Sequence, residues 1–242
     1  MASDSDQLDE AKERIEELEE AVRAAQHELQ FFVYAAGHDL QQPLRAIGTH
    51  AQLIQRQHPQ HERTREFTGV ILEGVSQMNA LLTDLLTYSR SGNSIEPTSV
   101  NLKASLQWAL FNLAKAIETS GAQVTSGELP QVLADEKQMV TVFENLLSNS
   151  IKFRGEAMPR VDIQGETADG FHTISITDNG CGIKPEYHEK VFEPFKRLHG
   201  REIPGSGLGL SLCGKIMRAH SGSIWVESDG ASGTIARFTV PA

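Results

Sequence analysis

Apolar residues recur every seven positions through the first part of the chain. They form two seams: Leu8, Ile15, Val22, Leu29 and Ala36 in one, and Ala11, Leu18, Ala25 and Phe32 in the other. Successive heptads with apolar a and d positions and a charged exterior predict a coiled coil. The alternative is a single amphipathic helix packed on a core, but no other apolar segment lies nearby in sequence to receive it.

The helical pattern continues past these seams to about Gln57, with Pro43 inside it. Proline removes a backbone donor, so we expect a kink or a loosened turn there. Residues 58–61 are typical of a turn, and a second helix is predicted over 62–90. Its apolar stripe consists of Phe67, Val70, Ile71, Val75, Met78, Leu82 and Leu85. One hairpin is too thin to bury this stripe, so two copies are expected to pair in a dimeric four-helix bundle.

The pattern changes at residues 91–97, whose glycine, serines and proline are typical of a linker. Beyond them, strands are predicted near Ser99 and over 122–125, 131–134, 160–166, 172–177, 223–227 and 234–240. Helices are predicted over 102–119, 136–153 and 208–219, with a loop-rich stretch at 180–206. This order predicts a mixed sheet with helices on one side, an α+β sandwich. We expect three parts: 1–30, 31–91 and 92–242.

The helix predicted over 136–153 carries three polar side chains on one face. Asn145, Asn149 and Lys152 stand at i, i+4 and i+7. Asparagine carbonyls are neutral oxygen ligands suited to Mg²⁺, and a lysine contacts phosphate oxygens as a point charge. Exposed polar residues without a ligand are the alternative, and the glycine-rich segments that follow argue against it.

Asp178 follows an alternating apolar segment and is therefore expected at the end of a strand. A carboxylate there can accept a hydrogen bond from an adenine amino group. Gly180 and Gly182 permit backbone turns that side chains would block. Aspartate-asparagine-glycine is also a common turn, so this segment gains weight only together with the others.

A second glycine-rich segment, Gly205, Gly207 and Gly209, leads into the helix predicted over 208–219. Backbone amides at such a helix start can face phosphates. The segment does not open a βαβ unit near the N-terminus, so a dinucleotide fold fails its context test.

The loop before this segment holds two phenylalanines and two cations. Phe192 and Phe195 are expected to anchor the loop on the core, and Lys196 or Arg197 to reach phosphate. Solvated charges on an ordinary loop are the alternative.

One of the nine histidines stands apart from the others. His38 is followed by Asp39 and lies shortly before Pro43, on the helix that the coiled coil would dimerise. A neutral imidazole nitrogen is a competent nucleophile near neutral pH, and a neighbouring carboxylate can orient it or take its proton. A nucleotide site together with this histidine predicts a protein that phosphorylates its own histidine.

Composition excludes several other functions. The formal net charge of −10 argues against general nucleic-acid binding. Residues 1–30 hold ten acidic and three basic residues, which accounts for most of that charge. No apolar run of about 18 residues is present, so no membrane segment is expected. Cys181 and Cys213 lack metal-ligand spacing and are expected to be free thiols in a reducing, cytoplasmic compartment.

Taken together, these motifs resemble the ordered boxes of a sensor histidine kinase of two-component systems. The segment that begins at His38 resembles the H box, 144–153 the N box, 178–182 the first glycine box, 192–195 the F box and 205–210 the second glycine box. The resemblance covers about residues 28–242. The H box, the basic loop and Ile224-Trp-Val-Glu-Ser are most similar to kinases downstream of PAS or phytochrome-type sensors.

This resemblance implies a coiled-coil signalling helix (1–30), a dimerisation and histidine phosphotransfer domain (31–91) and a Bergerat-type catalytic ATP-binding domain (92–242). His38 would accept the γ-phosphate of ATP, beside Asp39 as the acidic neighbour, and Arg197 would be a loop cation near that phosphate. Asn145 and Asn149 would associate with Mg²⁺. The remaining ATP contacts would be Lys152, Phe153, Asp178, Gly180, Gly182, Lys196, Gly205, Gly207 and Gly209.

The implied partners are a second copy of the chain and the receiver domain of a response regulator. Two departures from the family stand out. Gln42 occupies the place where many members carry a threonine or asparagine linked with phosphatase activity. No sensor domain precedes the coiled coil, so the input domain is missing from this chain or supplied by a partner. Two rival interpretations stay open: a catalytically silent dimeric ATP-binding scaffold, and another Bergerat-type ATPase.

Overall fold

The computed structural model describes residues 14–15, 33, 36–37, 39–198, 203 and 205–242. The chain forms two compact units, Met1–Ser89 and Arg90–Ala242. The predicted coiled coil lies almost wholly outside the described residues, and so does His38. Within the described ranges, no helix is long and apolar enough to cross a membrane.

The first unit contains a hairpin of two helices. The first helix is continuous over 39–57, including Pro43, and the second is α2, Glu62–Arg90. At the turn, the His58 amide donates to the Ile54 carbonyl at 3.1 Å, and the His61 amide donates to the His58 carbonyl at 3.2 Å. The expected turn at 58–61 and the second helix are therefore confirmed.

Small residues allow the two helices of the hairpin to approach closely. A Cβ on Gly48 would lie 3.3 Å from a methyl group of Val75, and one on Gly37 would lie 2.9 Å from Leu86. Many larger apolar side chains of the same unit are nevertheless exposed in the single chain. They are Leu40, Ile47, Leu53, Ile54, Phe67, Val70, Ile71, Met78 and Leu81.

The second unit is built on a five-stranded mixed sheet in the order β2-β4-β5-β7-β6. These strands are β2 Gln123–Ser126, β4 Arg160–Ala168, β5 Phe171–Asp178, β7 Ile235–Pro241 and β6 Ile224–Glu227. β2 runs parallel to β4, and the other neighbours are antiparallel. β1 (Thr98–Asn101) and β3 (Gln131–Ala134) pair in a separate two-stranded sheet, which the sequence did not distinguish from the main one.

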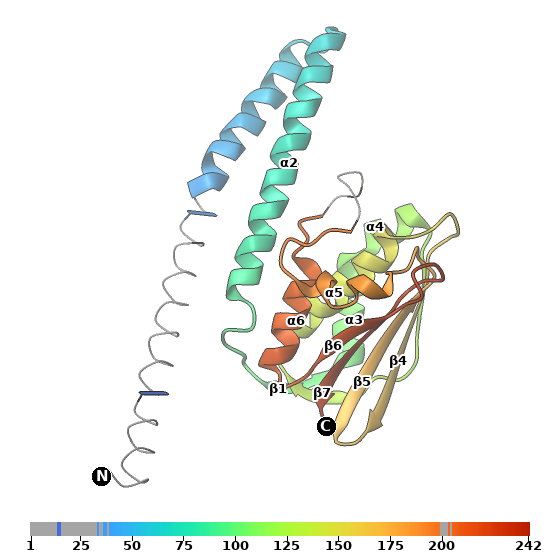
Figure 1. Ribbon diagram of the computed structural model, residues 1–242. Helices are drawn as coiled ribbons and strands as arrows, with labels where there is room; N and C mark the ends of the chain where they lie inside the picture. The colour runs from blue at the N-terminus through green and yellow to red at the C-terminus, as the bar shows by residue number, and fades with distance from the viewer. Residues whose placement is uncertain (1–13, 16–32, 34–35, 38, 199–202, 204) are drawn as a thin grey trace. The chain divides into compact units, whose positions relative to one another are not determined.

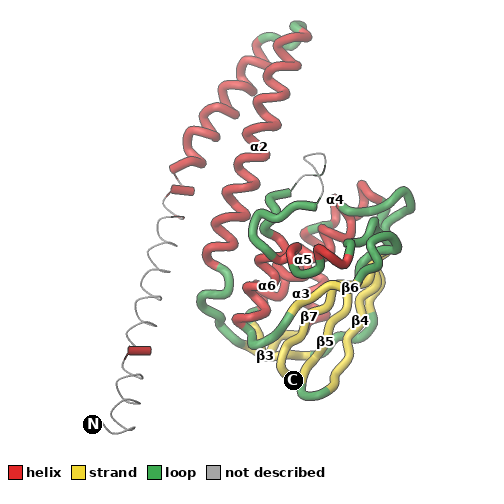
Figure 2. Tube along the Cα trace, viewed as in Figure 1, coloured by secondary structure: helices red, strands yellow, loops and turns green. Residues whose placement is uncertain are grey.

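Helices cover one face of the sheet (Figure 1, Figure 2). They are α3 Leu102–Asn112, α4 Ala114–Ser120, α5 Glu136–Lys152 and α6 Gly209–Ala219. The single helix predicted over 102–119 was wrong, because the backbone leaves helical geometry at Leu113, with ψ 6°. Two short 3₁₀ helices, Pro185–Tyr187 and Lys190–Phe192, lie in the loop-rich stretch.

The core forms where α5 meets the sheet. Phe143 of α5 and Phe238 of β7 are fully buried, and their rings meet edge to face with centroids 5.7 Å apart. Met139, Leu147 and Ile151 are buried as well. Because this apolar face of α5 is fixed against the core, the positions of its polar residues around the helix are fixed too.

Candidate nucleotide-binding site

Asp178 lies at the end of β5 and is held by three donors. Its Oδ1 accepts from the amides of Gly180 at 2.9 Å and Thr234 at 3.1 Å, and its Oδ2 accepts from the Ser150 hydroxyl at 3.1 Å. The Asp178 amide in turn donates to the Thr234 carbonyl at 2.9 Å. The orientation of the carboxylate is therefore fixed from α5, from its own turn and from the start of β7.

Burial raises the pKa of the Asp178 carboxyl, and the hydrogen bonds from Gly180, Ser150 and Thr234 oppose that rise. The net increase means that the charged form is less stable in the folded unit than in water. A buried acceptor of this kind suits a ligand that brings its own donor.

The turn after Asp178 packs against the end of α5. The Cys181 amide donates to the Phe153 carbonyl at 2.9 Å. A Cβ on Gly180 would lie 2.6 Å from that same carbonyl oxygen, so only glycine fits there. Gly182 has φ +75°, and a Cβ on it would lie 2.7 Å from the Ala231 amide nitrogen. The structure thus brings Phe153, Asp178, Gly180 and Gly182 together.

The start of α6 packs against the polar face of α5. The Asn145 amide group donates through Nδ2 to the Thr141 carbonyl at 2.8 Å. Its Oδ1 lies against Gly209, where a Cβ would stand 2.6 Å away. Asn149 is half-buried one turn further along α5, and Lys152 is exposed near the end of the helix. The predicted asparagine face and the second glycine segment therefore meet.

The second glycine segment packs against the backbone of the loop that precedes it. Gly207 has φ +76°, and a Cβ on it would lie 2.8 Å from the carbonyl carbon of Phe195 and 3.0 Å from the Lys196 oxygen. Lys196 Nζ is 3.9 Å from the Glu193 carboxylate. The Arg197 guanidinium donates to the Ile203 carbonyl at 2.7 Å. Gly205 is exposed, with open space where a Cβ would stand.

One expectation for this loop was wrong. Phe192 is half-buried, but Phe195 is 60% exposed and has φ +62°. Phe195 follows Pro194 at a tight turn, whose backbone carries the side chain away from the core.

The other predicted residues lie elsewhere or outside the described ranges. Asp39 and Gln42 are exposed on the helix of residues 39–57, and His38 is not described. Cys181 and Cys213 are not joined in a disulfide, and complete burial raises the pKa of Cys213 to about 12. Within the described ranges, no three His, Cys, Asp or Glu side chains gather as a metal site.

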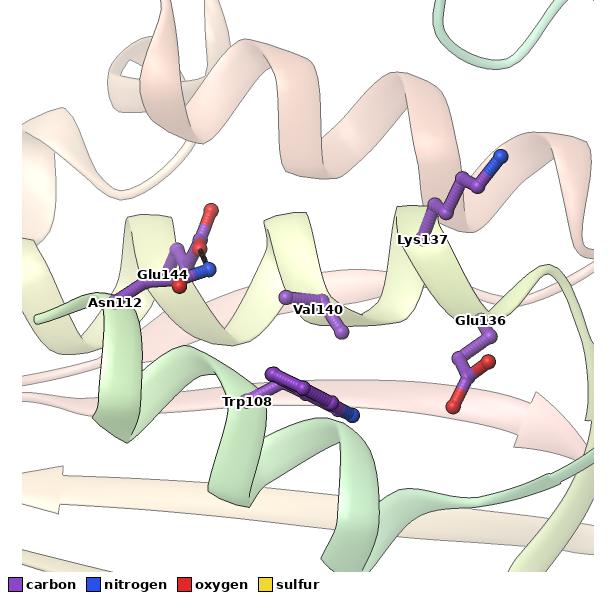
Figure 3. Close-up of a pocket in the computed structure, with 6 residues that line it drawn as sticks. All are labelled: Trp108, Asn112, Glu136, Lys137, Val140 and Glu144. Atoms are coloured by element: carbon purple, nitrogen blue, oxygen red, sulfur yellow. Dashed lines mark hydrogen bonds between the residues drawn. The ribbon is translucent and has the colours of Figure 1, made fainter.

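A hollow that the sequence did not reveal lies between α3 and α5 (Figure 3). Its volume is about 380 Å³, and it is lined by Trp108, Asn112, Glu136, Lys137, Val140 and Glu144. Asn112 donates a hydrogen bond to Glu144 across it. It contains none of the predicted nucleotide contacts, because Glu144 and Asn145 project from different faces of α5.

Sequence reasoning missed the residues that support Asp178. Ser150 and Thr234 bond to its carboxylate. Gly233, with φ +101°, is required because a Cβ there would lie 2.0 Å from the Asp178 carbonyl oxygen. The Ser228 hydroxyl donates to the Gly233 carbonyl at 2.6 Å. The Gly233-Thr234 pair just before the last strand was the available signal.

The structure joins a helical hairpin to an α/β sandwich, in which a hydrogen-bonded aspartate at a strand end lies beside two glycine turns. This combination is the one expected of a histidine kinase. The comparisons with known proteins agree with it. Residues 28–94 match the His Kinase A (phospho-acceptor) domain, and residues 134–242 match the family of histidine kinase-, DNA gyrase B- and HSP90-like ATPases. The chain belongs to the sensor histidine kinases and comprises their catalytic portion.

Individual relatives and solved structures are consistent with this family membership. The phytochrome-like protein Cph1 of Synechocystis sp. is 36% identical over 95% of this chain, which spans 31% of that relative's length. The catalytic domain of the histidine kinase ThkA is 29% identical, with a TM-score of 0.53, and the match covers 60% of this chain and 95% of that one. ThkA in complex with the response regulator TrrA shares the fold at 23% identity, with a TM-score of 0.61, over 99% of this chain and 67% of that one.

The raised pKa of Asp178 predicts a pH-dependent cost to stability. Below its ordinary value of 3.8 the carboxyl is protonated in both states. As pH rises through the raised folded pKa, ionisation favours the unfolded state and stability is lost. Asp178→Asn removes this loss, because its Oδ1 can still accept from Gly180 and Thr234. We expect the melting temperature of the variant, relative to wild type, to increase as pH rises above about 4.

Asp162→Asn is the control with the opposite sign. The hydroxyl of Thr125 and the side chain of Gln164 lower the pKa of the Asp162 carboxyl. The melting temperature of wild type, relative to this variant, should therefore increase as pH rises. Thermal melts of the three proteins across pH 3–7 measure both trends. Parallel trends for the two variants would contradict the assignment of a burial cost to Asp178.

Proposed function

We propose that this chain transfers the γ-phosphoryl group of ATP to His38 and then to an aspartate in the receiver domain of a response regulator. The observation that carries the proposal is the supported Asp178 carboxylate beside the glycine turns and the asparagine face of α5. The match to a phospho-acceptor domain over 28–94 includes His38.

ATP would bind over the edge formed by α5, the turn after β5 and the start of α6. Asp178 accepts a hydrogen bond from the adenine amino group, and Gly180 and Gly182 leave room for the ring beside Phe153. Backbone amides at Gly205, Gly207 and Gly209 face the phosphates at the start of α6, which is 11 residues long. Additional positive charge comes from the side chains of Lys152, Lys196 and Arg197.

Asn145 and Asn149 fit a divalent cation. The Nδ2 of Asn145 is engaged by Thr141, which turns its Oδ1 toward the glycine segment. Neutral carbonyl oxygens are hard ligands of the type that Mg²⁺ takes together with substrate phosphates and water. When bound, Mg²⁺ supplies charge neutralisation of the phosphate oxygens.

In the transfer step, a neutral ring nitrogen of His38 forms a bond to the γ-phosphorus, and the bond from that phosphorus to the oxygen of ADP breaks. Asp39 accepts or orients the remaining ring proton of His38. Arg197 stabilises the charge on the transferred group. In the second step an aspartate of the regulator takes the phosphoryl group, and His38 returns to its neutral form.

The proposed partners are inferred from the exposed surface of the hairpin and from the relatives. Among the described residues 39–90, nine large apolar side chains are exposed on the single hairpin, which supports a dimer through this unit. The histidine kinase ThkA, which shares the fold of this chain, is described in complex with a response regulator. The similarity to a phytochrome-like protein supports a sensor domain upstream of the catalytic portion. The rival function is a silent ATP-binding scaffold. It also predicts ATP binding and a dimer, but it predicts no phosphoryl label on His38.

His38→Gln should abolish self-phosphorylation and leave ATP affinity nearly unchanged, because His38 belongs to the phospho-acceptor match over 28–94 and not to the ATPase match over 134–242. The assay is incubation with γ-labelled ATP and Mg²⁺, where wild type should acquire an acid-labile, base-stable label. His50→Gln is the matched control, since His50 is an exposed histidine of the helix over 39–57. Undiminished labelling of His38→Gln would overturn the assignment, and an unlabelled wild type would favour the scaffold.

Asp178→Asn should weaken ATP binding roughly tenfold or more. The amide presents a donor where adenine also offers one, and a mismatched buried pair costs about 1–3 kcal/mol. Titration calorimetry measures the dissociation constant. Asp169→Asn, in the turn between β4 and β5, is the control and should bind ATP as wild type does. An unchanged constant for Asp178→Asn would contradict the adenine contact.

The full chain should be a dimer at micromolar concentration, because its hairpin cannot bury its apolar residues alone. Replacing Phe67 and Ile71 of α2 with lysine should shift the protein toward monomer, as measured by light scattering. Ser76→Lys adds a charge at an exposed polar position of the same helix and should leave the dimer intact. A monomeric wild type would refute the bundle.

A further inference from the structure

The linker between α2 and β1 is held by the side chains of Gln138 and Asp135 at the start of α5. The Gly92 amide donates to Gln138 Oε1 at 3.2 Å, and Gln138 Nε2 donates to the Ser94 carbonyl at 3.1 Å. The Glu96 amide donates to Asp135 Oδ2 at 3.3 Å. Both ends of the Gln138 amide group are thus used on the linker, and Gln138 is half-buried.

Gly92 is also seated against α6. Its φ is +71°, and a Cβ on it would lie 3.0 Å from the Lys215 carbonyl oxygen. The linker therefore has a defined path across the first turn of α5 and the side of α6, rather than extending freely into solvent.

The first turn of α5, which holds the linker, is itself fixed. Asp135 caps α5 by accepting from the Gln138 amide at 3.1 Å. The Asp135 amide donates to Nε2 of His220 at 3.0 Å. His220 is buried just after α6, and its Nδ1 lies 2.9 Å from the Ile216 carbonyl. Because Nε2 accepts, the ring proton is on Nδ1 and is donated to Ile216, so both nitrogens are satisfied.

The same two helices carry the candidate nucleotide residues at their other ends. α5 runs from the linker contact to Asn149 and Lys152, a helix of 17 residues. α6 begins at Gly209, which faces Asn145, and ends at Ala219, next to His220. A rigid body therefore joins the linker to the place where ATP is proposed to bind.

We propose that Gln138 is a positioning residue for phosphotransfer to His38, an inference that rests on the proposed function. α2 ends at Arg90, and the first anchored residue is Gly92, so Ser91 alone separates the helix from the anchor. Holding the linker removes backbone freedom between the hairpin and the catalytic unit. It thereby raises the fraction of time in which the γ-phosphate is presented to the histidine.

The test compares Gln138→Met with wild type in the full chain. Methionine keeps the length and helix propensity of glutamine but makes neither hydrogen bond. We expect the kcat of autophosphorylation to fall roughly threefold or more, since each lost hydrogen bond corresponds to about a fivefold change in an equilibrium. The KM for ATP should stay within about twofold, because the nucleotide contacts are at the far end of α5.

A second readout follows the linker itself. Amide hydrogen exchange in peptides covering residues 91–97 should become faster in Gln138→Met, while peptides from the middle of α5 stay protected. Gln107→Met alters an exposed glutamine of α3 and should match wild type in both measurements. Gln138→Glu keeps the acceptor for Gly92, loses the donor to Ser94 and suits the third position of a capped helix. Its kcat should lie between those of wild type and Gln138→Met.

Three results would overturn the proposal. Unchanged linker exchange in Gln138→Met would show that the side chain does not hold the linker. Faster exchange with an unchanged or increased kcat would show that holding it does not position the reaction. A raised KM with normal kcat would place the effect in the nucleotide pocket. Labelling of wild type in the same assay separates these outcomes from failure of the kinase function, which an unlabelled wild type would show.

Discussion

The catalytic unit depends on the burial of one face of α5 against the sheet. Phe143 and Phe238 meet edge to face at its centre, and both are excluded from solvent. Because an α-helix turns every 3.6 residues, fixing Phe143 inward also fixes Asn145 against the start of α6 and places Asn149 one turn further along α5. The geometry of the proposed cation ligands and the seating of Gly209 against Asn145 are both consequences of that one packing contact.

Asp178 illustrates how such a site conflicts with stability. Three hydrogen bonds hold its carboxylate, yet burial still raises its pKa above the ordinary value. A group selected for stability alone would be neutral at this position. The charge is tolerated because Gly180, Ser150 and Thr234 reduce its cost, and a ligand donor would reduce it further. The residual cost is an argument for a ligand that does not depend on sequence similarity.

The sequence predicted most of this architecture, and its failures have physical causes. Helices and strands with strong periodicity, such as α2, α5 and β3, have the expected bounds to within a residue. The break at Leu113 and the separate pairing of β1 with β3 depend on tertiary contacts that periodicity does not record. Phe195 was placed on the core because it is aromatic, but its backbone turn directs it outward.

The site shows the same division between local and distant information. Asn145, Asn149, Asp178 and the glycines belong to compact local motifs, so their types and spacing pointed to them. Thr234 and Gly233 support Asp178 from 56 and 55 positions away in sequence, and only the pairing of β5 with β7 brings them there. Their contributions are a backbone amide and the absence of a Cβ, so the glycine before the last strand was the sequence signal and it did not point to Asp178.

The two units solve the problem of burial in different ways. The catalytic unit encloses Phe143, Phe238 and many further apolar side chains in a core of its own, although some large ones, such as Phe111 and Phe195, stay exposed. The hairpin has one mutual interface, in which Gly48 approaches Val75, and it leaves Phe67, Val70 and Ile71 exposed. A second hairpin would cover these residues, so the stability of this unit would depend on protein concentration while that of the catalytic unit would not. The histidine segment is then the part whose packing an upstream change could alter, since a bundle held by partner contacts can repack without unfolding the nucleotide site.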